Sequence, residues 1–314
     1  MAALSAQGCA IEETYKLPEA EGVLDLYFYR KVGFQLARFF ARLRVSPISV
    51  TVLGGVFGVV AGHLYYYRDL RINIVGIALH ILANALDNAD GQLARMTGKG
   101  SREGRIIDSV VDHLIFGSVY FHLTLRCMAE GASPTVILLA IAAAVCHALQ
   151  GGAADYFRNG FLYFTKARSA VQFDSYADLG AEYQIIDWRA EPLKKFLLWL
   201  CLNFTRQQEM VMPDLNRLRT AVDREFPEQI PDWLQIRYRD YARPMFKWWG
   251  FLMANTRMMV LFVLLLVDQP VWFFWLQLTV FNLLFLVLLV RQNMFLRSTL
   301  SMTAANQPLD CVLR

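Results

Sequence analysis

The chain has few cysteines, and none of them shows a spacing that would give it a structural role. Its 314 residues include five cysteines, an odd number, and no Cys-x-x-Cys or Cys/His ligand spacing joins any of them. Neither a disulfide framework nor a zinc site is therefore indicated. We expect all five to be free thiols: Cys9, Cys127, Cys146, Cys201 and Cys311.

The chain also has little net charge. A formal charge of +4 is too small to indicate a nucleic-acid partner, and the basic residues cluster beside apolar stretches instead of forming one patch. Anionic lipid headgroups are the simpler partner. Residues 1–22 lack the basic start and the apolar run of a cleavable signal peptide, so we expect them to stay on the cytoplasmic side.

Apolar residues, in contrast, are abundant. The chain is 56% hydrophobic and 13% aromatic and has a positive mean hydropathy, which is the composition of a membrane protein. A helix of about 20 apolar residues crosses a hydrocarbon core of roughly 30 Å. The stretches of this kind predict an all-α bundle of six transmembrane helices, at 46–66, 72–95, 104–127, 134–156, 246–267 and 270–290.

The segment before the first span has the pattern of an amphipathic interfacial helix. Between Asp25 and Arg44, apolar side chains follow one helical face and polar or basic side chains follow the other. A helix packed on a soluble domain is the alternative. The expected apolar face consists of Leu26, Tyr29, Val32, Leu36, Phe39, Phe40 and Leu43. Basic residues concentrate on the N-terminal side of the spans, so the positive-inside rule places both termini in the cytoplasm.

One stretch between the spans is too long for a plain loop. Residues 158–245 contain helix-like runs broken by prolines, which predicts a cytoplasmic helical insertion. Within it, residues 193–204 would either lie on the membrane surface or pack inside the insertion. The expected organisation is an N-terminal segment with the amphipathic helix (1–45), four spans (46–157), the insertion (158–245), two spans (246–291) and a cytoplasmic tail (292–314).

Four aspartates interrupt the apolar pattern between Leu86 and Asp112. On the first of two expected helices, the residues of one face follow the spacing i, i+3, i+4, i+7: Asp87, Asp90, Gly91 and Ala94. On the second helix the spacing is four: Gly104, Asp108 and Asp112. A short polar loop joins the helices, so antiparallel packing would bring the four carboxylates together. Their mutual repulsion calls for divalent cations, and hard oxygen ligands select Mg²⁺, Mn²⁺ or Ca²⁺ over zinc.

The motif D-x-x-D-G-x-x-A-R, followed after eight residues by G-x-x-x-D-x-x-x-D, resembles at every fixed position the signature of the CDP-alcohol phosphotransferase family. So many fixed residues at fixed gaps make a specific signal. The resemblance implies two Mg²⁺ or Mn²⁺ ions held by Asp87, Asp90, Asp108 and Asp112, with Asp112 also acting as the general base. It also implies that the CDP moiety of the donor lies against Asp90, Gly91, Ala94, Arg95 and Gly104, and that the protein is a homodimer.

Outside the motif the indications are weaker. The family commonly has a Pro-Asn pair at the start of its first span, whereas here Pro47 is followed by Ile48. Thr51 keeps its hydroxyl, which would either bond back to its own helix or contact a ligand. The acceptor pocket has several candidates, each of which could instead form helix-to-helix hydrogen bonds or snorkel: His80, Asn84, His147, Gln150, Asp155, Arg158, Asn255 and Arg257.

The resemblance implies transfer of a substituted phosphate group from a CDP-linked donor to an alcohol, with release of CMP, in phospholipid synthesis at a site facing the cytoplasm. We favour CDP-diacylglycerol as the donor. The alternative within this class is transfer of phosphocholine or phosphoethanolamine from CDP-choline or CDP-ethanolamine to diacylglycerol, because the motif reads only the CDP moiety and the metals. A cation transporter is the alternative of another class. Against it, the carboxylates lie at one interface and the spans show no paired Gly/Pro breaks.

Overall fold

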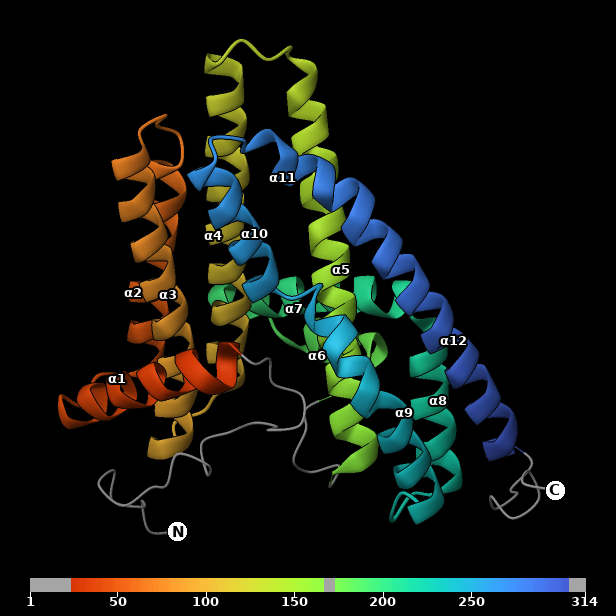
Figure 1. The fold of residues 1–314 in the computed structure, drawn as a ribbon. Coiled ribbons are helices and arrows are strands. Elements are labelled where there is room, and N and C mark those ends of the chain that lie inside the picture. Colours follow the sequence, from red (N-terminus) through yellow and green to blue (C-terminus); the bar gives the residue numbers. More distant parts are fainter. Residues whose placement is uncertain (1–23, 167–172, 305–314) are drawn as a thin grey trace. The chain divides into compact units, whose positions relative to one another are not determined.

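The computed structural model of the chain describes residues 24–166 and 173–304, and in these two ranges it contains helices and no strand (Figure 1). The elements in chain order, with η marking a π-helix, are η3 (Asp25–Tyr29), α1 (Arg30–Arg42), α2 (Pro47–Leu64), α3 (Leu70–Thr97), α4 (Arg102–Ala129), α5 (Thr135–Thr165), α6 (Tyr176–Ile185), α7 (Pro192–Val211), α8 (Pro213–Glu225), α9 (Asp232–Gly250), α10 (Ala254–Leu266), α11 (Val271–Leu276), η5 (Gln277–Phe281) and α12 (Asn282–Ala304).

Six helical stretches are long and apolar enough to cross a membrane, which confirms the predicted six-span all-α architecture. They are Pro47–Leu64, Leu70–Thr97, Arg102–Ala129, Thr135–Thr165, Asp232–Leu266 and Val271–Thr303. The last two stretches each combine consecutive helices, α9 with α10 and α11 with α12. Residues 176–245 fold as α6, α7, α8 and most of α9, so the expected insertion is helical where the structure describes it.

Several helices continue beyond the apolar stretch that marks them in the sequence. The fourth span was expected to end near Tyr156, whereas α5 continues to Thr165. In this extension Phe157 stacks on Trp249 of α9 with ring centroids 5.1 Å apart, and Phe164 stacks on Tyr238 at 4.6 Å. Aromatic packing of this kind stabilises a helix outside the hydrocarbon region, which the hydropathy pattern alone does not reveal.

The residues form two compact units, and we describe each by itself. The first consists of the described parts of 1–145 together with 257–278, and the second of the described parts of 146–256 and 279–314. These units group the helices by packing, whereas the five segments expected from the sequence follow the order of the membrane crossings. In the first unit, α10 and α11 bury apolar side chains in one core with α2, α4 and the first part of α5.

Within the first unit, α2 is the central element. It packs against both α3 and α4, whereas α3 and α4 make few direct contacts with each other. The interfacial helix α1 packs on α3 and lies across it (Figure 1). The relative position of α3 and α4 therefore depends on how closely each of them approaches α2.

Local sequence signals define where α3 and α4 begin and end. The side chain of Asp69 accepts two backbone N–H bonds, at 2.8 and 3.2 Å, and so caps the start of α3. The helix ends at Gly98, which adopts the left-handed conformation with φ of 66°. Ser101 then accepts the backbone N–H of Gly104 at 2.9 Å and caps α4. Only residues 98–101 connect the two helices, so their adjoining ends lie at the same level.

The helix expected before the first span is present as η3 and α1, and it contacts the rest of the chain through small residues. Of the expected apolar face, Tyr29 is buried, while Phe39 and Leu43 are exposed. Contact with α3 runs through a face of α1 that includes Gly33 and Ala37, both buried. A Cβ at Gly33 would lie 3.2 Å from backbone atoms of α3. Small residues thus let α1 approach α3 closely and leave large apolar side chains facing outward.

Candidate active site

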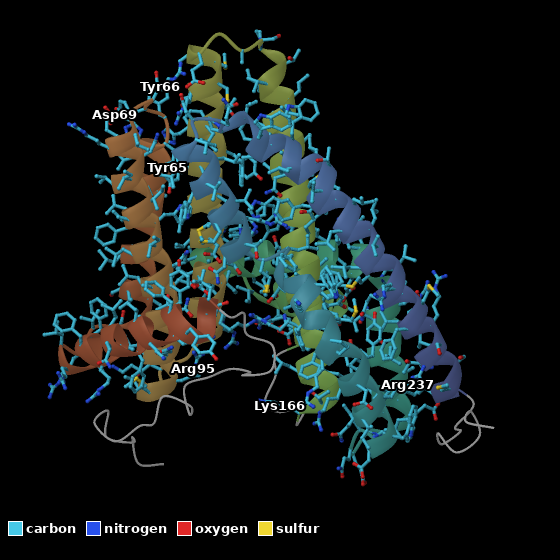
Figure 2. The ribbon with its side chains drawn as sticks, viewed as in Figure 1. Tyr65, Tyr66, Asp69, Arg95, Lys166 and Arg237 are labelled. Carbon is cyan, nitrogen blue, oxygen red and sulfur yellow. The ribbon has the colours of Figure 1, made fainter. Side chains whose placement is uncertain are left out.

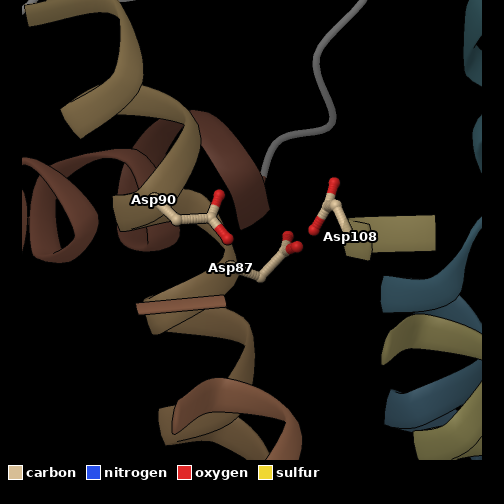
Figure 3. A group of neighbouring side chains, drawn as sticks. All are labelled: Asp87, Asp90 and Asp108. Atoms are coloured by element: carbon tan, nitrogen blue, oxygen red, sulfur yellow. The ribbon is translucent and has the colours of Figure 1, made fainter. Parts of the chain in front are cut away.

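Three of the four motif aspartates lie together in the first unit. Asp87 and Asp90 are on α3 and Asp108 is on α4, and one carboxylate oxygen from each lies within 4.8 Å of the other two (Figure 3). Asp90 is only 7% exposed, and Asp108 is half-buried. The spacing of Asp87 and Asp90 puts both on one face of α3, and the short α3–α4 connection brings Asp108 to the same level.

Glycines on α2 set the separation of the two helices that carry these carboxylates. A Cβ placed on Gly54 would lie 3.3 Å from Ala83 O of α3. A Cβ on Gly58 would lie 2.6 Å from Ile115 of α4, and one on Gly62 would lie 2.9 Å from the backbone nitrogen of Val119. At Gly62, where the neighbouring atom belongs to the backbone, only glycine allows so close an approach. The α2 seam formed by Gly54, Gly58 and Gly62 was not predicted from the sequence, although such a spacing of small residues is a recognisable signal.

Thr51 of α2 connects that helix directly to the carboxylate cluster. Its hydroxyl hydrogen bonds to a carboxylate oxygen of Asp90 and also lies 3.1 Å from the carbonyl oxygen of Pro47, one turn earlier in α2. The sequence left two alternatives open for Thr51: a bond back to its own helix and a contact in the site. The hydroxyl makes both contacts. The contact holds Asp90 in a fixed orientation.

One carboxylate oxygen of the cluster stands without a hydrogen-bond partner among the residues that the structure describes. Oδ1 of Asp108 is buried and has no hydrogen-bond partner. Buried polar atoms are nearly always paired, and a carboxylate oxygen accepts hydrogen bonds or binds cations. An unpaired, buried oxygen beside two further carboxylates fits a divalent cation with hard oxygen ligands such as Mg²⁺ or Mn²⁺.

Asp112 lies apart from these three residues. It follows Asp108 by one turn of α4 and is exposed, and it is not in the group of carboxylates that lie within 4.8 Å of one another. Its side chain is exposed on the surface of the described chain, whereas that of Asp90 is buried.

The small residues of the motif leave open space beside the cluster. The three atoms nearest to a Cβ on Gly91 would all belong to the Arg95 guanidinium, whose nitrogens would lie 3.5 Å away. One on Gly104 would meet Ser101 Oγ at 3.1 Å and Ile48 at 3.8 Å. Unlike the glycines of α2, Gly91 is therefore not a helix-packing residue. Arg95 is exposed at the same end of α3, and Ala94 is half-buried beside it (Figure 2).

Several acceptor-pocket candidates make hydrogen bonds between helices. In the first unit, His80 pairs with the Tyr65 hydroxyl at 3.1 Å, and Asn84 donates to the Tyr29 hydroxyl at 3.4 Å. Arg257 donates to Gln277 at 3.2 Å. In the second unit Gln150 donates to Asn282 at 2.6 Å, and Asp155 accepts a bond from Gln208 of α7 at 3.4 Å. Asp155 also accepts bonds from Arg158 and Asn159, both at 3.0 Å and both within α5. The contacts between helices fit the alternative in which the residues form hydrogen bonds of this kind instead of an acceptor pocket.

The far end of the first unit, by Tyr65 and Asp69 (Figure 2), holds a charge network that the sequence did not indicate. Arg126 of α4 is 2% exposed, pairs with Asp268, and donates to Glu130 at 3.0 Å. Arg68 donates to the same Asp268 at 2.8 Å. Burial alone would raise the pKa of Asp268, but the hydrogen bonds from Arg68 and Arg126 outweigh it and lower that pKa. This network holds the ends of α4 and α10 together.

Comparison with known proteins places this site in a family. The family profile described as CDP-alcohol phosphatidyltransferase matches residues 44–177, which include α2, α3, α4 and the whole aspartate motif. The chain therefore carries a domain of the CDP-alcohol phosphatidyltransferase family. Its six apolar helices make it a multi-pass integral membrane protein.

Curated relatives match this domain over part of their length. A phosphatidylinositol phosphate synthase of Streptomyces avermitilis is 35% identical over 95 residues, which are 30% of this chain and 37% of the relative. An archaetidylinositol phosphate synthase of Pyrococcus horikoshii is 33% identical over 91 residues, or 29% of this chain and 47% of the relative. The chain thus spans less than half the length of these relatives.

Proposed function

We propose that the protein transfers a phosphatidyl group from CDP-diacylglycerol to a phosphorylated inositol, with release of CMP. The observation that carries the transferase activity is the group formed by Asp87, Asp90 and Asp108 inside the family domain. Two of the similar proteins are named synthases of inositol-containing phosphate lipids, which supports inositol phosphate as the acceptor. It also favours a CDP-lipid donor over CDP-choline or CDP-ethanolamine.

The carboxylates of Asp87, Asp90, Asp108 and Asp112 would hold two Mg²⁺ or Mn²⁺ ions. When bound, such ions neutralise the pyrophosphate of the donor and the charge that develops on the leaving CMP. Thr51 orients Asp90 toward this position through its hydroxyl. The repulsion among neighbouring carboxylates and the unpaired oxygen of Asp108 both support this assignment.

The remaining motif residues would bind the donor and move one proton. Gly91 and Ala94 allow the nucleotide to approach α3, and the guanidinium of Arg95 would bind a phosphate. Asp112 would take the proton of the attacking hydroxyl. The hydroxyl oxygen then bonds to the phosphorus that carries the lipid, the bond between that phosphorus and the bridging oxygen breaks, and CMP leaves with the bonding electrons. The exposed position of Asp112 suits contact with an entering alcohol.

The orientation and assembly of the protein are part of this proposal. The basic residues beside the spans support a site that faces the cytoplasm, where CDP-linked donors would be available. The homodimer stays a prediction of the family resemblance.

The test is release of CMP by the purified protein in Mg²⁺ or Mn²⁺. CDP-diacylglycerol is offered with inositol phosphate, inositol, glycerol phosphate or serine, and CDP-choline or CDP-ethanolamine is offered with diacylglycerol. We expect release with CDP-diacylglycerol and inositol phosphate, its loss in EDTA, and a large loss in Asp112→Asn. Glu228→Gln, which changes an exposed carboxylate in the second unit, is the matched control and should retain activity.

Each other result has a defined meaning. Release with another alcohol would keep the transferase activity and refute the acceptor. Release only with CDP-choline or CDP-ethanolamine would refute the donor. No release with any pair, from protein that is folded and binds Mn²⁺, would refute the transferase activity and favour ion transport.

A further inference from the structure

The outward face of α7 is apolar, although α7 lies outside the six candidate spans. Leu193, Phe196 and Trp199 are 67%, 44% and 44% exposed, and their spacing of three places them along one side of the helix. The six candidate spans leave out residues 166–231 altogether. A group of large exposed side chains of this kind marks a surface that contacts something other than water.

Packing inside the insertion accounts only for the opposite side of α7. Leu198 is buried in a core with Leu179 of α6 and Ile186, and Leu197 is also buried. Of the two alternatives that the sequence left open, packing therefore applies to the inner side. The side that carries Phe196 is not covered by the described residues of this chain.

The contact between α7 and α5 fixes the depth of α7 in a membrane. Gln208 of α7 donates to the carbonyl oxygen of Gly152 at 3.0 Å, and Figure 1 shows α7 running across α5. From Thr135, where α5 begins, to Gly152, the helix rises about 26 Å at 1.5 Å per residue. The hydrocarbon core is roughly 30 Å thick. Because α5 is a candidate span, α7 crosses it where hydrocarbon gives way to headgroups.

The turn before α7 has the composition of that boundary. Ile185 and Trp188 are exposed. The amino group of Lys195 lies 5.8 Å from the Trp188 ring centroid and 4.6 Å from that of Tyr183, and it donates to the Ile186 carbonyl oxygen at 2.6 Å. Tryptophan, tyrosine and lysine are the side chains that proteins place at the level of the headgroups.

We propose that α7 and the turn before it lie in the lipid–water interface, with Leu193, Phe196 and Trp199 among the upper acyl chains. The occupant of this face is bilayer lipid, because α7 meets α5 at the depth where lipid surrounds a spanning helix. The proposal rests on the six candidate spans and not on the transferase activity. It makes the insertion a membrane-attached layer instead of a domain surrounded by water.

Spin labelling of the full chain in lipid bilayers tests this. All five cysteines are first replaced by alanine, and Phe196→Cys or Leu193→Cys then carries a nitroxide label in phosphatidylcholine vesicles with or without phosphatidylglycerol. Labels at Leu138, an exposed residue within the α5 span, and at Glu228, an exposed loop residue, are the lipid and water references. The measured quantity is the accessibility of each label to oxygen and to a water-soluble nickel chelate.

We expect the ratio of oxygen to nickel accessibility at position 196 to approach that at Leu138 and to exceed that at Glu228 several-fold. Nickel accessibility equal to that at Glu228 would show a water-exposed face and overturn the proposal. Low accessibility to both reagents would show that protein, such as a second copy of the chain, covers the face, and would overturn it as well. Leu193→Cys provides the same readout if Phe196→Cys does not fold, as judged by gel filtration and circular dichroism.

Discussion

Replacing Asp108 by asparagine should stabilise the protein without metal and weaken its response to metal. The oxygens of Asp87, Asp90 and Asp108 lie within 4.8 Å of one another. Two unit charges at that distance repel by about 3 kcal/mol at an effective dielectric constant of about 20. Asp108→Asn removes two such repulsions, and because Asp108 is only half-buried, solvent screening lowers the expected gain to about 1–3 kcal/mol.

The metal response should change in the opposite direction. A divalent ion at 100 times its Kd stabilises the wild-type protein by about 2.7 kcal/mol. Because the variant lacks one ligand, its affinity for Mg²⁺ or Mn²⁺ should fall by at least about tenfold. The assay is thermal unfolding of the protein in detergent, first in EDTA and then across a titration with each ion. In EDTA the variant should have the higher Tm. With metal bound, the difference in Tm between the variant and the wild type should become smaller or change sign.

Glu228→Gln serves as the control, because it removes an exposed carboxylate outside the site and should leave both the Tm in EDTA and the metal response unchanged. Our reasoning fails if Asp108→Asn gains as much Tm from Mg²⁺ and Mn²⁺ as the wild type. It fails equally if the variant is the less stable protein in EDTA.

Three further predictions concern Thr51, the α2 seam and the far charge network. Thr51→Ala loses the hydroxyl that is bonded to Asp90 and should lower the affinity for Mn²⁺ by about 10–100-fold. Thr51→Ser keeps a hydroxyl and should retain that affinity. Isothermal titration with Mn²⁺ measures both variants. Gly62→Ala places a methyl group 2.9 Å from backbone of α4 and should destabilise by about 1–3 kcal/mol. Gly117→Ala, with nothing within 4 Å, should stabilise by about 0.5–1 kcal/mol; thermal unfolding compares them. The pKa of Asp268 is lowered in the folded protein. The carboxylate therefore stabilises the fold at pH values above its pKa in the unfolded chain, about 3.9. This stabilisation is lost as the pH falls through the lower pKa of the folded protein. Asp268→Asn should therefore lower Tm near pH 7 and have little effect at pH values below both pKa values, as measured by Tm against pH.

These three predictions have separate failure conditions. Equal Mn²⁺ affinity in Thr51→Ala and Thr51→Ser would show that the hydroxyl does not orient Asp90. Equal Tm shifts in Gly62→Ala and Gly117→Ala would show that the α2 seam is not tightly packed. A Tm difference between wild type and Asp268→Asn that persists unchanged at the lowest pH would show that the ion pairs are not its source.

The sequence predicted the helices and the grouping of the carboxylates because both follow from periodicity along single helices. Apolar length gave the six spans, and the spacing of Asp87 and Asp90 placed them on one face. The close approach of Asp108 followed from the short connection between α3 and α4. The comparison with known families confirmed the recognition that rested on the same residues.

The sequence did not show which neighbouring helix completes the site. Helical periodicity indicates the face of a residue but not the element that packs there. The motif suggested that α3 and α4 pack together, whereas each packs on α2. The bond from Thr51 to Asp90 and the position of Asp112 outside the closest group depend on that third helix. For α1, likewise, the pattern indicated an apolar face for lipid but not the face with Gly33 and Ala37 that contacts α3.

The compact location of the carboxylate cluster has a consequence for biosynthesis. Every residue that holds or orients it lies between Pro47 and Ala129, on three consecutive helices joined by short connections. Contacts between neighbours in sequence form early and fast. A chain emerging from the ribosome could thus assemble its carboxylate cluster as soon as α4 has entered the bilayer, before α10, α11 and α12 are made. Metal supply would then influence maturation of the protein as well as its activity.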